Sequence, residues 1–94
     1  SMFRSASNFN SDISHWDVST ITIMDFLFDG AALFNQPLNT WDVSNVTSMG
    51  QLFQNAPSFN QPLDQWNVSN VTYLPFIFNG ASAFNQPIGN WDVS

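Results

Sequence analysis

The fold of this chain follows from one stretch, Trp41-Asp42-Val43-Ser44-Asn45-Val46-Thr47, because related copies of it recur along the whole sequence. The copies begin at Trp16, Trp66 and Trp91, so successive tryptophans are 25 residues apart. A fixed period of this length indicates an array in which each unit packs against its neighbours. We call each 25-residue unit a row and each set of equivalent positions a column.

Apolar residues fill the same columns in every row. A single row is too short to enclose a core, whereas stacked rows bury a continuous one. We therefore expect these columns to form the core, with Trp41 and Val43 among them. The main columns are Phe3/Phe28/Phe53/Phe78, Phe9/Phe34/Phe59/Phe84, Trp16/Trp41/Trp66/Trp91, Ile13/Leu38/Leu63/Ile88 and Val18/Val43/Val68/Val93.

After the opening stretch, apolar residues follow at helical spacing. Met49, Leu52, Phe53 and Ala56 lie at i, i+3, i+4 and i+7, which is one face of a helix. Threonine is suited to cap the start of such a helix, and glycine or asparagine to accept the left-handed position after its end. The spacing predicts a two-turn helix in each row, starting near Thr22, Thr47 and Thr72 and ending before Gly30, Asn55 and Gly80.

A strand is expected in the other half of the row. The residue before a proline is pushed to an extended conformation, so Gln36-Pro37 favours extended backbone. We place the best-paired strand between Leu38 and Val43. Equivalent strands of successive rows would lie parallel, about 4.8 Å apart.

At these residues the chain resembles the bacterial surface-protein repeat family, which is related to BspA-like leucine-rich repeats and is common in lipoproteins and wall-attached proteins. The similarity covers essentially the whole chain and rests on Phe34 to Leu38, Trp41 to Thr47, Met49, Phe53 and Ala56. It implies an α/β repeat, a right-handed leucine-rich-repeat-like solenoid of about four turns, with one short parallel strand and one short helix per 25-residue turn. It also implies an extracellular, non-enzymatic role in adhesion or protein contact.

The domain organisation expected from the period is a single array. Residues 1-94 divide into rows of roughly 1-19, 20-44, 45-69 and 70-94, and the sequence is expected to be a fragment of a longer protein. Incomplete rows at both ends would leave core surface uncovered, which predicts end-to-end self-association.

Composition excludes several classes of function. The chain has seven aspartates, one arginine and a net charge of −6, which argues against nucleic-acid binding. It has no cysteine and no apolar run long enough to span a bilayer. No nucleophile–base pair or phosphate loop is apparent, and His15 is expected at the surface, so we expect no enzyme activity, no catalytic residue, no cofactor and no metal site.

The aspartate column Asp17/Asp42/Asp92, interrupted by Asn67, allows two interpretations. Stacked carboxylates are a possible calcium site. Alternatively, each aspartate fixes a turn by accepting a hydrogen bond from the backbone two residues on. The turn interpretation is favoured because Asn67 would remove one charged ligand.

Candidate binding residues lie on the outer side of the predicted helices, where the rows differ. Phe26 and Phe76 share a column with Gln51 between them, and both would point outward. Exposed aromatic residues in a soluble array often mark a contact site. The predicted partner-binding set is Ile23, Asp25, Phe26, Gln51, Tyr73 and Phe76.

The expected partner is a protein or a glycan at the cell surface, or another copy of the chain. The alternative function is a structural spacer, or an ice- or ordered-water-binding array built on the hydroxyl column Thr22/Thr47/Thr72.

Finally, Arg4 lies one row before Asp29 in the same column, which predicts an ion pair between rows.

Overall fold

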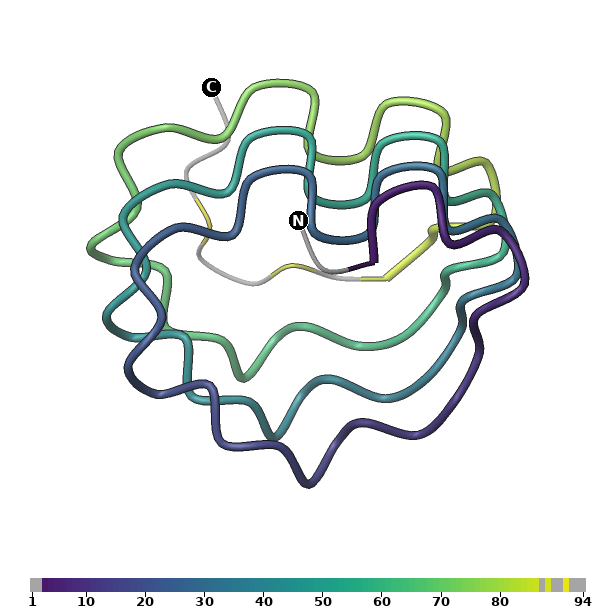
Figure 1. Ribbon diagram of the computed structural model, residues 1–94. Helices are drawn as coiled ribbons and strands as arrows, with labels where there is room; N and C mark the ends of the chain where they lie inside the picture. The colour runs from purple at the N-terminus through teal and green to yellow at the C-terminus, as the bar shows by residue number, and fades with distance from the viewer. Residues whose placement is uncertain (1–2, 87, 89–90, 92–94) are drawn as a thin grey trace.

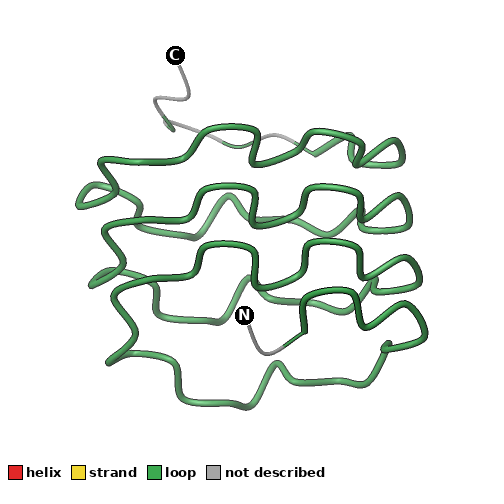
Figure 2. Ribbon diagram, turned by 45° about the horizontal axis from the view of Figure 1, so that its top comes forward, coloured by secondary structure: helices red, strands yellow, loops and turns green. Residues whose placement is uncertain are grey.

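Each row makes one circuit of the chain, and successive circuits lie above one another (Figure 1). This computed structural model describes residues 3–86, 88 and 91. Turned forward, the rows form tiers of loops and turns that repeat the same outline (Figure 2). The 25-residue period therefore sets the register between rows, so that equivalent residues of successive rows lie next to one another along the stack.

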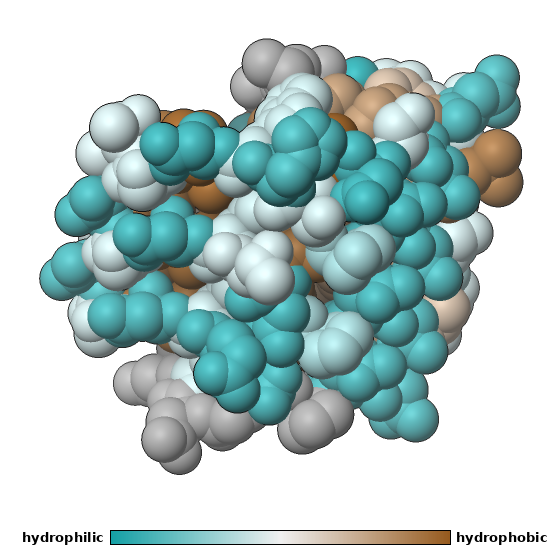
Figure 3. All heavy atoms as spheres, turned by 90° about the horizontal axis from the view of Figure 1, so that it is seen from below, coloured by the Kyte–Doolittle hydropathy of each residue, from teal (hydrophilic) through white to brown (hydrophobic). Residues whose placement is uncertain are grey.

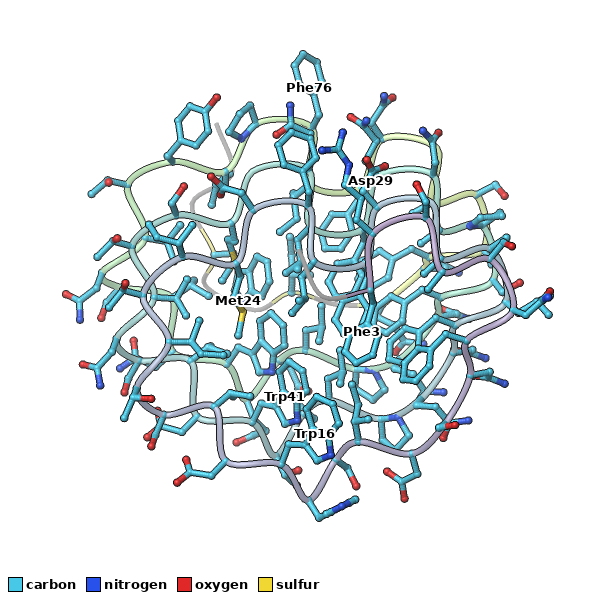
Figure 4. The ribbon with its side chains drawn as sticks, in the orientation of Figure 1. Phe3, Trp16, Met24, Asp29, Trp41 and Phe76 are labelled. Atoms are coloured by element: carbon cyan, nitrogen blue, oxygen red, sulfur yellow. The ribbon has the colours of Figure 1, made fainter. Side chains whose placement is uncertain are left out.

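Aromatic rings stack along the columns and form the core. The rings of Phe28 and Phe53 lie 5.6 Å apart and almost parallel, at 3°, and those of Phe34 and Phe59 lie 5.9 Å apart, also at 3°. All four are fully buried. Within a row the two phenylalanine columns touch, since the rings of Phe53 and Phe59 are 4.1 Å apart. Figure 4 shows Phe3, Trp16, Trp41 and Met24 directed toward this interior.

The expectation that Trp41 and Val43 are core residues is confirmed, since they are 4% and 1% exposed. The indole N–H of Trp41 donates to the carbonyl oxygen of Ile13 at 3.0 Å. A buried indole N–H needs an acceptor, and the row below supplies it. Val93, which was placed in the same column as Val43, lies outside the described residues.

The predicted α/β leucine-rich-repeat solenoid, with one helix and one strand per turn, is wrong. The described residues contain no helix, and their strand pairing is limited to two isolated parallel bridges, Ile23 with Ser48 and Ser48 with Tyr73. The molecule measures 31 × 28 × 20 Å. Every circuit is built from turns and irregular segments instead.

Row spacing explains why no helix forms at Met24 to Ala31 or its equivalents. Neighbouring helix axes need 8–10 Å, whereas the phenylalanines of this segment stack at 5.6–5.8 Å between rows. Alternate amides therefore donate to the next row, as Phe28 does to the carbonyl of Leu52 at 3.0 Å. The amides between them close short turns, such as Ala31 to Phe28 at 3.0 Å. The residues at helical spacing do face the interior, as the pattern predicted, but turns and not a helix direct them there.

Threonine does not cap a helix in this fold, but the residues expected at the helix end do adopt the predicted conformation. Gly30, Asn55 and Gly80 have φ of 76°, 56° and 77°. In each row this residue is the third of a four-residue turn, which the following alanine amide closes, as Ala31 does on the Phe28 carbonyl at 3.0 Å. The sequence thus located the left-handed position correctly and assigned it to the wrong element.

The strand predicted between Leu38 and Val43 is also absent. Two turns occupy this region, closed by the amide of Trp41 on the carbonyl of Leu38 and by the amide of Val46 on that of Val43, both at 3.0 Å. Parallel pairing occurs instead at the Ser48 column. Pairing is possible there because no proline stands at the bridged positions Ile23, Ser48 and Tyr73, which join the last three rows.

The Asn-Gln-Pro segment builds a ladder of side-chain hydrogen bonds between rows. Asn35 Oδ1 accepts from the backbone N–H of Asn60 at 2.9 Å and from Gln61 Nε2 at 3.1 Å. The same pattern joins Asn60 to Asn85 and Gln86, and Asn10 to Asn35 and Gln36. This ladder gives backbone amides a partner where no strand exists.

Candidate functional site

One outer edge of the rows carries the residues predicted to bind a partner. We define the aromatic face as Ile23, Phe26, Gln51, Tyr73 and Phe76. The bridges through Ser48 align Ile23 with Tyr73, and the row-to-row bonds Phe26 to Gly50 and Gln51 to Pro75 place the other three in one column. The structure therefore brings the predicted set together on neighbouring rows, although on turns and not on helices.

The aromatic face exposes large apolar side chains. Ile23, Tyr73 and Phe76 are 58%, 54% and 64% exposed, and Phe26 is half-buried. Figure 4 shows the ring of Phe76 projecting from the edge of the molecule, away from the interior. Among the described residues no other ring or cation contacts Phe76. Exposed apolar area of this kind is typical of contact surfaces.

The backbone of this column is strained. Phe26, Gln51 and Phe76 have φ of 62°, 54° and 57°, in the left-handed region that glycine or asparagine normally occupies. For other residues this conformation costs roughly 1–2 kcal/mol. Phe26 is the third residue of the turn that the Leu27 amide closes on the Met24 carbonyl at 3.3 Å, the position at which a type II turn has a positive φ. The turn does not need an aromatic ring, since Gln51 serves the same turn position.

Asp25, also predicted to bind a partner, uses its carboxylate within the chain. Its Oδ1 accepts from the Ser48 hydroxyl at 2.6 Å and from the Gly50 amide at 2.8 Å. The side chain is half-buried. Asp25 therefore fixes the row that follows it, beneath the aromatic face.

Arg4 belongs to the same edge and was not among the predicted binding residues. The predicted ion pair is confirmed, with Arg4 Nε 3.2 Å from Asp29 Oδ2. The guanidinium carbon also lies 4.2 Å from the ring centroid of Phe26, a cation–π distance. Arg4 is 22 residues before Phe26, so only the turn geometry brings them together, and no periodic signal could have shown it.

The side of the molecule opposite Phe76 is mostly hydrophilic (Figure 3). Trp16 and Trp41 lie toward that side, and each is followed by an exposed aspartate. Asp42 Oδ1 accepts from the Ser44 hydroxyl at 2.6 Å and from its backbone amide at 3.0 Å. Asp17 is bonded to Ser19 in the same way.

These bonds confirm the turn interpretation of the aspartate column. The serine hydroxyl, and then the serine amide, hold the pKa of Asp17 and of Asp42 below the ordinary value of 3.8. Asn67 keeps the same bond to the Ser69 amide at 3.1 Å without a charge. The described residues include no cluster of three or more acidic or histidine side chains that could hold a metal. Asp92 lies outside the described residues.

The threonine column is exposed and regular. The Thr47 hydroxyl donates to the Thr22 carbonyl and the Thr72 hydroxyl to the Thr47 carbonyl, each at 3.3 Å. These hydroxyl protons are used between rows, and Ile23 and Tyr73 protrude beside the column. The ice-binding alternative stays a prediction that this geometry does not favour. His15 is exposed as expected.

The outer rows are less well covered than the middle ones. Trp16 is 38% exposed, whereas Trp41 and Trp66 are 4% and 5% exposed. End-to-end self-association therefore stays a prediction. A pocket of about 460 Å³ is lined by residues of the last two rows, and among these residues Asp64 is the single ionisable side chain. The residues that line it are Asp64, Trp66, Asn67, Val68, Ser69, Val71, Leu74 and Trp91.

No segment in the described part of the chain forms a helix able to cross a membrane.

Comparison with curated proteins gives no match, and comparison with solved structures gives none either. The family model described as "Mycoplasma protein of unknown function, DUF285" matches residues 1–94, the full length of the sequence. The chain therefore belongs to this family.

Proposed function

We propose that this chain is a non-enzymatic binding scaffold at the cell surface, which contacts another protein through the aromatic face. The observation that carries the proposal is that Phe76 is both exposed and held in a left-handed backbone conformation. Its ring is 64% exposed on a residue whose φ is 57°. A bulky side chain at this φ costs stability, and its exposed ring adds nothing to the core, so the fold alone gives no reason for it.

The equivalent positions strengthen this reasoning. Gln51 takes the place of Phe76 in the preceding row, and Ser48 takes the place of Tyr73. The Gln54 amide closes the same turn on the Gln51 carbonyl at 3.2 Å, and Ser48 forms parallel bridges with both Ile23 and Tyr73. An aromatic side chain is thus an addition to a turn that forms without it. Tyrosine and phenylalanine are enriched where proteins bind each other.

Cell-surface location is supported by composition and by the resemblance to surface-protein repeats. Solvent-facing positions carry mostly serine, threonine, asparagine and glutamine, and only 9% of residues are charged. Row-to-row hydrogen bonds, such as the asparagine ladder, use many of these amides. A stiff stack of this kind presents a fixed surface to a partner, which lowers the entropy lost on binding.

Binding is tested by probing a panel of purified extracellular proteins and glycans with the labelled chain. The variant Tyr73→Ser with Phe76→Gln replaces each aromatic residue by its counterpart from the preceding row. We expect saturable binding to a protein, and a loss of at least about tenfold in affinity for this variant, as for residues that dominate an interface.

The matched control is Leu33→Ser, which removes an apolar side chain that is 51% exposed in a different column. This variant should bind as the unchanged chain does. Absence of any saturable protein binding would overturn the proposal. So would binding to glycans alone, or an equal loss of affinity in the control. Chemical denaturation of each variant verifies that the fold is intact.

A further inference from the structure

Arg4 and Phe26 show how this surface holds a cation. The guanidinium lies 4.2 Å from the centre of the ring, and its Nε donates to Asp29 Oδ2 at 3.2 Å. The turn that joins the ring to the acceptor is closed by the Asp29 amide on the Phe26 carbonyl at 3.1 Å. One short turn thus supplies both an aromatic face and a hydrogen-bond acceptor three residues on.

The same turn recurs at Phe76 and Asn79. The Asn79 amide donates to the Phe76 carbonyl, again at 3.1 Å, and Phe76 has nearly the same φ as Phe26, 57° against 62°. Asn79 is exposed, and its side-chain oxygen can accept where Asp29 does. Gln54 occupies the position equivalent to Arg4, so in the described part of the chain no cation lies over the Phe76 ring.

The net negative charge of the chain favours a ligand that carries positive charge. Seven aspartates against a single arginine give a net charge of −6, which attracts cationic groups over long range. Arginine suits the turn better than lysine, because its planar guanidinium stacks on a ring and still donates hydrogen bonds at its edge.

From these observations we infer that Phe76 and Asn79 receive an arginine side chain of the partner protein, stacked on the ring as Arg4 is on Phe26. The inference rests on the proposed function and adds the chemistry of the partner segment. The partner would present an exposed arginine in a basic stretch. Selectivity for arginine would come from ring and acceptor together.

The test uses three capped peptides that carry three arginines, three lysines or three citrullines at the same positions. Citrulline has nearly the shape of arginine and no charge. Each peptide is titrated into the isotope-labelled chain, and chemical shifts of the Phe76 ring and the Asn79 side-chain amide are followed. We expect saturable shifts with the arginine peptide, weaker ones with lysine and none with citrulline.

Phe76→Leu is the matched variant, since it keeps an apolar side chain and leaves the net charge unchanged. An exposed cation–π contact contributes about 0.5–1 kcal/mol, so affinity for the arginine peptide should fall about two- to fivefold. The inference fails if citrulline binds as tightly, if the shifts concentrate at Asp17 and Asp42, or if Phe76→Leu has no effect.

Arg4→Gln supplies a second, independent test. It uncovers the Phe26 ring and frees the Asp29 carboxylate, so the arginine peptide should now also shift the resonances of both residues. Unchanged Phe26 and Asp29 resonances in folded Arg4→Gln would overturn the inference. Should the arginine preference fail while the double variant Tyr73→Ser with Phe76→Gln still loses affinity on the protein panel, the proposed function stands. If there is no arginine preference and the double variant binds the panel as the unchanged chain does, the proposed function fails together with the inference.

Discussion

The indole N–H of Trp66 donates to the carbonyl oxygen of Leu38, 28 residues earlier, at 2.8 Å. The equivalent bond joins Trp41 to Ile13 at 3.0 Å. Trp41 and Trp66 therefore each fill the core of their own row and donate to a carbonyl of the row before, whereas the buried indole N–H of Trp91 has no partner among the described residues. This double role explains why the tryptophan column defines the period.

Replacing Trp66 with phenylalanine should lower the free energy of unfolding by about 2–4 kcal/mol. The change removes one of the two donors to the Leu38 carbonyl, which keeps its bond to the Trp41 amide at 3.0 Å, and it opens space in a packed core. Denaturant titration measures the loss. Trp16→Phe is the control, since Trp16 is 38% exposed, and it should cost less than half as much. Equal losses at both positions would show that the hydrogen bond and burial do not matter.

Removing one member of the asparagine ladder should also destabilise the stack. Asn35→Ala takes the acceptor from the Asn60 amide and from the Gln61 side chain, at a cost of about 1–2 kcal/mol. Asn35→Asp keeps an acceptor at the same place and should cost less. Amide hydrogen exchange at Asn60 reports the change directly. Unaltered protection of Asn60 in Asn35→Ala would contradict this role.

Substitution by alanine should lower the free energy of unfolding more at Gly80 than at Gly50. At Gly80 a Cβ would lie 2.6 Å from Asn55 Oδ1 on a residue with φ of 77°, so Gly80→Ala should cost about 1–3 kcal/mol. At Gly50 the Cβ would lie 2.9 Å from Cε2 of Tyr73, an exposed side chain that can move aside. Gly50→Ala should therefore stay within about 1 kcal/mol, helped by the lower chain entropy of the unfolded state.

Thermal denaturation of both glycine variants beside the parent chain is the measurement. A larger loss at Gly50 than at Gly80 would mean that the Tyr73 ring is fixed in place, and that it belongs to the packed part of the fold.

Acid should weaken the fold through the aspartate turns. The pKa of Asp17 and Asp42 lies below 3.8 in the folded chain, because serine hydroxyls and amides bond the charged form. A lowered folded pKa gives stability that is complete above the unfolded value and is lost as pH falls through the folded value. The melting temperature should therefore drop as the pH is taken below about 4.

Asp17→Asn with Asp42→Asn should reduce this drop and leave the neutral-pH melting temperature nearly unchanged. Asn67 shows that an amide accepts the same backbone bond, and the exchange removes the repulsion between stacked charges that acts on Asp42. Identical pH profiles for parent and variant would show that these turns do not contribute to acid sensitivity.

The sequence by itself determined the period, the core columns, the aspartate turns, the left-handed position at Gly30 and the Arg4–Asp29 pair. These features depend on residue type and on equivalence between rows, both of which a 25-residue repeat displays directly. It also selected the outward column of Phe26 and Phe76, because that column departs from the apolar pattern.

Only the tertiary structure decided which secondary structure the rows adopt. An i, i+3, i+4, i+7 pattern marks residues on one side of a helix, but here successive turns direct the same residues inward. The choice depends on the distance between rows, which stacked phenylalanine rings set at 5.6–6.0 Å, too close for neighbouring helices. The same packing places Arg4 on the ring of Phe26, a contact that depends on how two rows turn and not on their period.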